Sequence, residues 1–291
     1  MTRAAPPRRL VYLGTPEVAV APLRALVAAG FDVVLVVTRP DKRRGRGSQL
    51  SPSPVKAAAT ELGLPVSHSV DDVMSSGADL GVVVAFGQLI KPHVLDAVPM
   101  VNLHFSLLPR WRGAAPVERA LLAGDEQTGV CLMQLEAGLD TGPVFRCEVV
   151  PIETSVIADD LREELVTVGT RLLIEELSAG LGEARPQSGE PTYAAKIRAD
   201  ELQIDWTRPS TEIDRLVRVG GAWTTVGGKR LKIIRAEVVD QSASPSGELM
   251  EDRVGGLRLV TVQPEGRPSM PFAAFARGAR LDGRQHLGGA G

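Results

Sequence analysis

The stretch Asn102–Pro116, NLHFSLLPRWRGAAP, sets an amide, an imidazole and a hydroxyl at alternate positions. In an extended segment alternate side chains point to the same face, so Asn102, His104 and Ser106 are predicted to project into one cleft. An imidazole exchanges protons near neutral pH, and a carboxamide donates hydrogen bonds to an oxygen that becomes negative during acyl transfer. The stretch therefore predicts chemistry at a carbonyl carbon.

A lone carboxylate occurs downstream, in the segment Gly138–Gly142, GLDTG. The flanking glycines permit a tight turn, and Asp140 lies at its centre. One interpretation is that Asp140 orients the imidazole of His104. The other is that its carboxylate only caps its own turn, as aspartate between glycines commonly does.

The segments around this stretch predict an α/β fold. Apolar, β-branched runs at residues 10–13, 33–38, 80–85 and 100–104 are typical of buried parallel strands, with helices at 17–29 and 92–97 between them. The stretch 102–116 then begins at the carboxyl end of a strand, where open α/β sheets bind their ligands. No GxGxxG motif follows the first strand, and residues 45–49 lack the lysine of a phosphate-binding loop, so a sheet of this kind need not imply NAD or ATP here.

The rest of the chain predicts a second domain. A helix at 116–123, a hairpin with strands at 130–136 and 144–150, and a helix at 158–179 complete a catalytic domain over residues 1–182. Residues 183–203 are rich in Pro, Gly, Ser and charge, which indicates an exposed linker. Short apolar strands with close turns over residues 204–291 then predict a small β-barrel.

Composition bounds the class of protein. The chain has 291 residues, 44% of them hydrophobic and 23% charged, which is ordinary for a globular protein of two domains. No apolar run reaches the roughly 18 residues of a membrane helix, and a cytoplasmic location is expected. Cys131 and Cys147 are expected to be buried thiols, with a disulfide as the weaker alternative. The net charge of −2 limits any nucleic-acid contact to local basic patches.

Several motifs together carry a family resemblance. NLHFSLLP, PRWRGAAP and GLDTG closely resemble the signature of folate-dependent formyltransferases, and WRGAAP is characteristic of the branch that acts on aminoacylated initiator tRNA. The resemblance covers most of the chain; its further segments are Leu13–Pro16, Thr38–Asp41, Gly45–Gly47, Ser51–Lys56 and Val84–Gly87. It implies a Rossmann-like, mostly parallel sheet flanked by helices, followed by an OB-like β-barrel domain.

The resemblance also implies an activity. It is the transfer of a formyl group from 10-formyltetrahydrofolate to the α-amino group of methionine on initiator tRNA. This chemistry requires no metal, and a monomer is expected. Asn102 and His104 are then expected to stabilise the negative oxygen, and Asp140 to orient His104 and accept a proton. The residues expected to line the folate pocket are Ser106, Leu107, Leu108, Pro109, Val84, Ala85, Phe86 and Gly87.

Two basic sets are candidates for contacts with tRNA. The first follows the second strand and contains Arg39, Lys42, Arg43, Arg44, Arg46 and Lys56, of which the resemblance favours Arg46 as a contact to the end of the acceptor stem. The second lies in the C-terminal domain and contains Arg215, Arg218, Lys229, Arg230, Lys232 and Arg235, which suit contacts to sugar and phosphate. The alternative for each set is a solvated surface with no RNA partner.

The sequence departs from the family pattern at two places. The segment 66–80 is shorter than usual, and Gly220-Gly221 replaces a Pro-containing segment before Trp223. Neither departure touches Asn102, His104 or Asp140. Three other functions stay open at this point: formyl transfer to a small amine, hydrolysis that releases formate, and RNA binding without catalysis.

Overall fold

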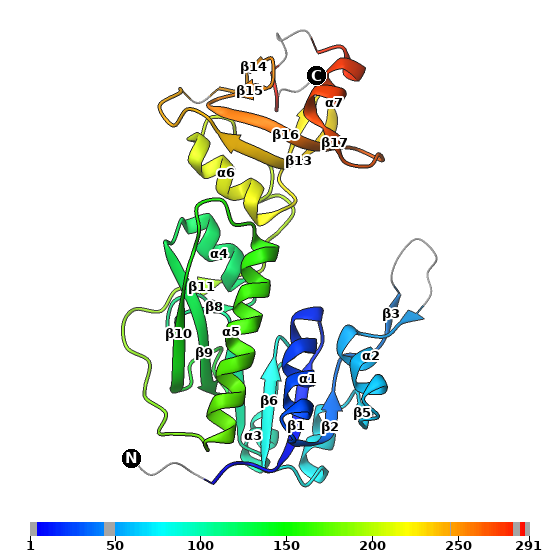
Figure 1. Ribbon diagram of the computed structural model, residues 1–291, viewed down its shortest axis with the longest axis vertical. Helices are drawn as coiled ribbons and strands as arrows, with labels where there is room; N and C mark the ends of the chain where they lie inside the picture. Colours follow the sequence, from blue (N-terminus) through cyan, green and yellow to red (C-terminus); the bar gives the residue numbers. More distant parts are fainter. Residues whose placement is uncertain (1–4, 44–49, 245, 282–285, 289–291) are drawn as a thin grey trace. The chain divides into compact units, whose positions relative to one another are not determined.

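The computed structural model describes residues 5–43, 50–244, 246–281 and 286–288, and its chain divides into two units (Figure 1). The first unit comprises residues 1–116, 127–151 and 162–195; the second comprises residues 117–126, 152–161 and 196–291. Each unit has a hydrophobic core of its own. The domain boundaries at residues 182 and 203 stay a prediction.

A seven-stranded sheet forms the centre of the first unit, in the order β10-β9-β7-β6-β1-β2-β5. Its strands are β1 (Arg9–Gly14), β2 (Asp32–Val37), β5 (Val66–Ser67), β6 (Leu80–Val84), β7 (Met100–His104), β9 (Gln127–Gln134) and β10 (Val144–Pro151). The neighbouring strands β5, β2, β1, β6 and β7 pair in parallel. Strand β9 is antiparallel to both β7 and β10. The predicted mostly parallel sheet is thus confirmed, with the β9–β10 hairpin at one edge.

Helices cover both faces of this sheet, because its strands are apolar on both sides. Figure 1 shows α1 and the long α5 lying across one face. On the other face, Val11, Leu13 and Val37 of the strands share a core cluster with Val73 and Val94. The helical segments are η1 (Glu17–Ala19), α1 (Val20–Ala28), α2 (Pro54–Glu61), η2 (Val70–Ser75), α3 (Pro92–Ala97), α4 (Pro116–Ala123) and α5 (Ala158–Ser178), with α4 and the start of α5 assigned to the second unit.

The segment 66–80, which is shorter than the family pattern, contains the edge strand β5 and the 3₁₀ helix η2. Two small strand pairs complete the first unit. In one, β3 (Lys42–Arg43) is antiparallel to β4 (Leu50–Ser51); in the other, β8 (Arg112–Gly113) is parallel to β11 (Tyr193–Ala194).

The second unit is built on an antiparallel sheet of six strands. Its elements are α6 (Ser210–Val219), β12 (Trp223–Val226), β13 (Lys229–Val238), β14 (Leu249–Met250), β15 (Arg253–Val254), β16 (Leu257–Pro264), β17 (Met270–Pro271) and α7 (Phe272–Ala279). The predicted β-rich second domain is confirmed. The pairs among the described residues run in the order β12-β13-β16-β15-β14 and do not join the two end strands, so closure into a barrel stays a prediction.

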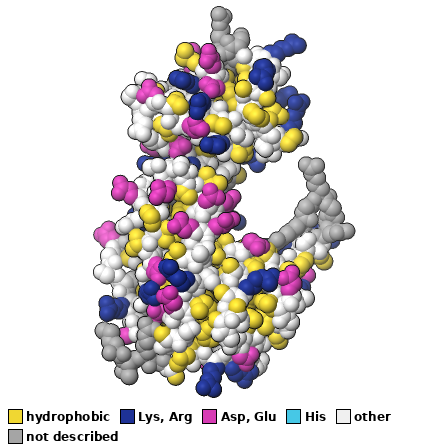
Figure 2. Space-filling view, viewed as in Figure 1, with side chains coloured by type: hydrophobic (Ala, Val, Ile, Leu, Met, Phe, Trp, Pro, Cys, Tyr) yellow, Lys and Arg dark blue, Asp and Glu magenta, His cyan; other side chains and the backbone are white. Residues whose placement is uncertain are grey.

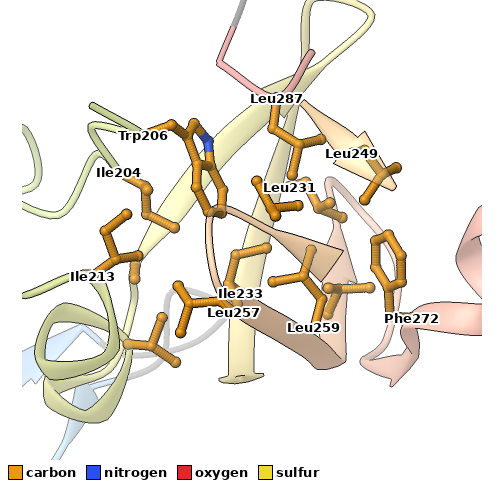
Figure 3. Packing of buried hydrophobic residues seen from close by; sticks show 14 residues of the cluster. Ile204, Trp206, Ile213, Leu231, Ile233, Leu249, Leu257, Leu259, Phe272 and Leu287 are labelled. Atoms are coloured by element: carbon orange, nitrogen blue, oxygen red, sulfur yellow. The ribbon is translucent and has the colours of Figure 1, made fainter. Parts of the chain in front are cut away.

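The core of this second unit follows from alternation along its strands. Leu231 and Ile233 of β13 are buried, whereas Lys232 between them is exposed. Figure 3 shows the side chains of Leu231 and Ile233 in the same cluster as Trp206 and the side chains of β16. Trp206 satisfies its indole N–H by donating to Thr224 Oγ1 at 2.9 Å. Period-2 alternation thus places Lys232 on the outer face, between the inward-facing Leu231 and Ile233.

The two cysteines differ from the expectation of thiols. Cys131 of β9 and Cys147 of β10 are directly opposite each other in the antiparallel pair, and they form a disulfide. The side chains of directly opposed residues lie on the same face of a sheet, which brings the sulfur atoms together. The alternative given less weight from the sequence is therefore the one observed.

The described residues show no helix long and apolar enough to cross a membrane. They also contain no group of three or more His, Cys, Asp or Glu side chains arranged to hold a metal ion.

Candidate active site

Strand β7 ends at His104, with Asn102 two residues before this end and Ser106 two residues after it, in a bend and not in the extended segment predicted from the sequence. β7 is flanked by β6 on one side and by β9 on the other, and all three side chains are buried. His104 and Ser106 both reach the carbonyl oxygen of Trp111: His104 Nε2 is 2.9 Å from it and Ser106 Oγ is 3.5 Å away. The imidazole and the hydroxyl therefore meet at one acceptor, although the extended segment ends at His104 and Ser106 lies in the bend after it.

Asp140 joins the same group of side chains. Its Oδ1 accepts a long hydrogen bond of 3.5 Å from Asn102 Nδ2, and its Oδ2 lies 3.7 Å from Nδ1 of His104. The second distance is that of an ion pair, not of a hydrogen bond. The firmest contact of the carboxylate is with the main chain, since the N–H of Gly113 donates to Oδ2 at 2.8 Å. The amide, imidazole and carboxylate predicted from separate motifs thus meet in one place.

The turn that carries Asp140 has an unusual backbone. Asp140 has φ of 50°, a left-handed conformation in which aspartate is more frequent than most non-glycine residues. Gly142 follows at a close approach, because a Cβ built there would lie 2.0 Å from the carbonyl oxygen of Gln134. The glycine is thus required where the hairpin chain turns back against β9.

The imidazole of His104 has one hydrogen-bond partner, the carbonyl oxygen of Trp111, and the carboxylate of Asp140 lies on its other side. Trp111 O accepts hydrogen bonds but cannot donate, so His104 Nε2 carries a proton in this arrangement. Nδ1 faces the carboxylate of Asp140. Trp111 itself has φ of 62°, a left-handed conformation that is rare for a bulky residue.

Ser106 is engaged by the main chain. Its hydroxyl donates to the carbonyl oxygen of Arg110 at 2.6 Å, and the whole residue is buried. Among the other residues predicted to line the folate pocket, Ala85 and Gly87 are exposed and Leu107, Leu108 and Pro109 are half-buried, whereas Val84 and Phe86 are buried. β6 and β7 are parallel neighbours, so the segments after them emerge at the same edge of the sheet.

The first basic set is only partly described. Arg39 donates to the carbonyl oxygen of Gly87 at 3.1 Å, which attaches it to the segment after β6. Lys42 and Arg43 are exposed in β3, and Lys56 is paired with Asp41 at 2.8 Å. The predicted contacts Arg44 and Arg46 lie outside the described residues.

The second basic set divides by position. Lys229 and Lys232 are exposed on β13, and the guanidinium of Arg230 lies 4.2 Å from the ring centre of Trp223. Figure 2 shows Lys and Arg side chains spread over the visible face of this unit, among acidic and hydrophobic ones.

Two arginines of α6 are more enclosed than the β13 side chains. Arg218 is paired with Asp214 at 2.8 Å, and both side chains are largely buried. Arg215 packs against Gly124, where an added Cβ would touch its guanidinium. These contacts give Arg215 and Arg218 a packing role within the second unit.

Two residues near the site were not found from the sequence. Gln187 donates from Nε2 to the carbonyl oxygens of Asp140 and Gly142, at 2.8 Å each. Thr192 Oγ1 accepts from the N–H of Trp111 at 2.9 Å. Both belong to the segment predicted as a linker, and neither stands in a motif with a known role, so no pattern singled them out.

Comparison with known proteins places the chain in a family. The model of the formyl transferase family matches residues 8–177, and that of the formyl transferase C-terminal domain matches residues 196–280. The chain belongs to the formyl transferase family. A relative from Dinoroseobacter shibae, named methionyl-tRNA formyltransferase, is 43% identical over 298 residues, which cover 95% of this chain and 99% of that protein.

Solved structures agree with the formyltransferase fold. The N-formyltransferase from Helicobacter canadensis, solved with folinic acid and dTDP-3-aminofucose, has a TM-score of 0.64 at 18% identity and covers 88% of this chain and 99% of its own. Methionyl-tRNA formyltransferase from Clostridium thermocellum has a TM-score of 0.54 at 14% identity, covering 79% of this chain and 92% of its own. Both show a shared architecture.

The role of Ser106 can be tested by removing its hydroxyl. In Ser106→Ala we expect the free energy of unfolding to fall by about 1 kcal/mol, because the carbonyl of Arg110 loses its hydrogen bond. Urea denaturation measures this change, with Ser178→Ala, an exposed serine at the end of α5, as the control. Unchanged stability with a severalfold higher KM for the folate donor would instead assign the hydroxyl to folate binding.

Proposed function

We propose that this formyltransferase transfers the formyl group of 10-formyltetrahydrofolate to the α-amino group of methionine on initiator tRNA. The juxtaposition of Asn102, His104 and Asp140 carries the chemical part of this proposal. The near full-length identity to methionyl-tRNA formyltransferase of Dinoroseobacter shibae supports the choice of acceptor. The monomeric state, the cytoplasmic location and the dispensability of a metal remain predictions.

The site must stabilise a developing negative oxygen. Formyl transfer places negative charge on the formyl oxygen when the amine attacks, and a preorganised N–H donor is the usual means of binding such an oxygen. Asn102 has two N–H groups on Nδ2, and one bond to Asp140 leaves the second for this oxygen. His104 Nε2 is already bonded to Trp111 O, so we assign the oxyanion to Asn102 first.

The reaction also moves one proton. The attacking amine loses a proton and the departing folate nitrogen gains one, so a group between them must hold it in transit. We assign this role to the carboxylate of Asp140. Nδ1 of His104 lies 3.7 Å from Oδ2 of Asp140, so the imidazole is next to the negative charge of the carboxylate. Asp140 and His104 thus work as a pair in acid–base chemistry, whereas Asn102 works on the oxygen.

The folate donor supplies the activated formyl group, and the chain must hold it next to Asn102. The exposed positions Ala85 and Gly87 and the half-buried segment 107–109 are suited to this, since they leave adjacent strand ends at the edge where Asn102 and His104 lie. Open α/β sheets bind ligands at this edge. Phe86 and Ser106 support these segments from within, through a buried ring and a main-chain hydrogen bond.

A formylation assay tests the proposal. Purified protein with 10-formyltetrahydrofolate is expected to formylate charged initiator methionyl-tRNA, and not uncharged or elongator tRNA. In Asn102→Ala we expect kcat to fall by about 10²–10³-fold, the usual loss when one oxyanion donor is removed.

Three results would contradict parts of this function. Equal rates with small amines would point to a different acceptor, and formate release without any amine would point to hydrolysis. An Asn102→Ala variant with unchanged turnover would remove the assigned role of the amide. Circular dichroism of this variant should match the parent protein, so that a loss of turnover reports on chemistry.

Contacts of the second unit with tRNA make a separate prediction. Lys232 is exposed between two buried residues of β13, so its removal should leave the core intact. In Lys232→Ala we expect weaker binding of all tRNA sequences and a reduction of about 1 in the slope of log affinity against log salt. Filter binding over a salt series measures the slope, with Lys91→Ala, an exposed lysine of the first unit, as the control. An unchanged slope would remove Lys232 from the tRNA-binding surface.

A further inference from the structure

Residues 187–194 lie alongside the candidate site, although the sequence indicates a linker there. Their main chain is hydrogen-bonded to residues 112–114. Arg112 N donates to Thr192 O at 2.8 Å, and Ala114 N donates to Ala194 O at 2.8 Å. Ala194 is also buried. This strap, defined here as residues 187–194, is therefore part of the catalytic unit and in contact with the elements around His104.

The side-chain amide of Gln187 is saturated by its neighbours. Nε2 donates to Asp140 O and to Gly142 O, at 2.8 Å each. Oε1 accepts from the guanidinium of Arg112, at 3.1 Å from Nε and 2.6 Å from Nη2. A carboxamide has two donor hydrogens and two acceptor lone pairs, and all four are used. Gln187 thus joins the turn of Asp140 to the segment of Arg112.

These bonds close a ring around the carboxylate. Arg112 is followed by Gly113, whose N–H donates to Oδ2 of Asp140 at 2.8 Å. Gln187 binds both the side chain of Arg112 and the main chain of Asp140. The backbone of Asp140 is held at φ of 50°, a conformation that persists only when its surroundings fix it. The position of the carboxylate relative to His104 therefore depends on Gln187.

The other end of the strap reaches the second neighbour of the imidazole. Thr192 Oγ1 accepts from Trp111 N at 2.9 Å, and Trp111 O accepts from His104 Nε2 at 2.9 Å. Trp111 has φ of 62°, so its peptide groups also need fixed partners. Thr192 thus holds the residue whose carbonyl orients the ring.

We propose that Gln187 and Thr192 are positioning residues for the imidazole of His104. Gln187 fixes Asp140 on the Nδ1 side of the ring, and Thr192 fixes Trp111 on the Nε2 side. This assignment rests on the proposed roles of His104 and Asp140 in formyl transfer. Its physical basis is that displacement of a reacting group by about 1 Å can cost 10²-fold in rate while binding of the substrates is retained.

Isosteric variants separate positioning from general support of the fold. Gln187→Glu keeps the acceptor for Arg112 but removes both N–H donors to the turn of Asp140. Thr192→Val keeps the shape but removes the acceptor for Trp111, whereas Thr192→Ser retains it. Gln127→Ala, which truncates an exposed glutamine at the start of β9, is the matched control.

The test is steady-state formylation of initiator methionyl-tRNA by the full chain, below the unfolding temperature of each variant. We expect kcat of Gln187→Glu and of Thr192→Val to fall by about 10–100-fold, with KM for both substrates within twofold of the parent. Thr192→Ser should recover most of kcat, and Gln127→Ala should be unchanged. A merely structural role would lower the unfolding midpoint without this split between kcat and KM.

The failure of the proposal differs from failure of the proposed function. If Asp140→Asn lowers kcat but Gln187→Glu and Thr192→Val stay within twofold of the parent, the positioning roles are wrong and the function stands. A raised KM with unchanged kcat in either variant would also overturn the proposal, because it would indicate a contact with substrate. If Asp140→Asn itself keeps full kcat, the proposed role of Asp140 fails, and the positioning of Asp140 by Gln187 fails with it.

Discussion

The buried carboxylate of Asp140 imposes the constraint on which the site depends. Its residue is only 9% exposed, and an uncompensated charge at such a position costs several kcal/mol. The compensating groups are the N–H of Gly113, the amide of Asn102 and the imidazole of His104. The hairpin turn, strand β7 and the segment of β8 must therefore meet around this carboxylate. The polar contacts of the site thus depend on the topology that brings these three segments together.

Much of this arrangement could be predicted because it follows from local periodicity. Apolar runs mark the parallel strands, and alternation along residues 102–106 places Asn102 and His104 on one face. The GLDTG turn is visible from its glycines, of which Gly142 has no room for a side chain. The spacing of the two cysteines also predicts their pairing, because Cys131 and Cys147 are equally distant from residue 139, at the centre of the turn. Their disulfide follows from the register of the β9–β10 hairpin.

The partners of the catalytic side chains could not be predicted in the same way, because half of them are main-chain atoms. Trp111 O and Gly113 N become partners only when the folded chain brings residues 111–113 against His104 and Asp140. Residue type carries no information about such contacts, since every residue has the same peptide group. Gln187 and Thr192 were missed for a related reason: a Pro- and Gly-rich composition indicates an exposed connection, and only tertiary contacts show that this one is anchored.

The two strained residues next to His104 show why the site needs this anchoring. Trp111 and Asp140 both have positive φ, and each such conformation costs of order 1–3 kcal/mol unless its surroundings compensate. At Asp140 a glycine would relieve the strain, but it would remove the carboxylate. At Trp111 the left-handed turn lets its N–H meet Thr192 while its carbonyl meets His104. Strain is therefore retained at the residues that orient the imidazole. The hydrogen bonds that offset this strain come from a distant part of the chain, since Gln187 is 47 residues from Asp140 and Thr192 is 81 residues from Trp111.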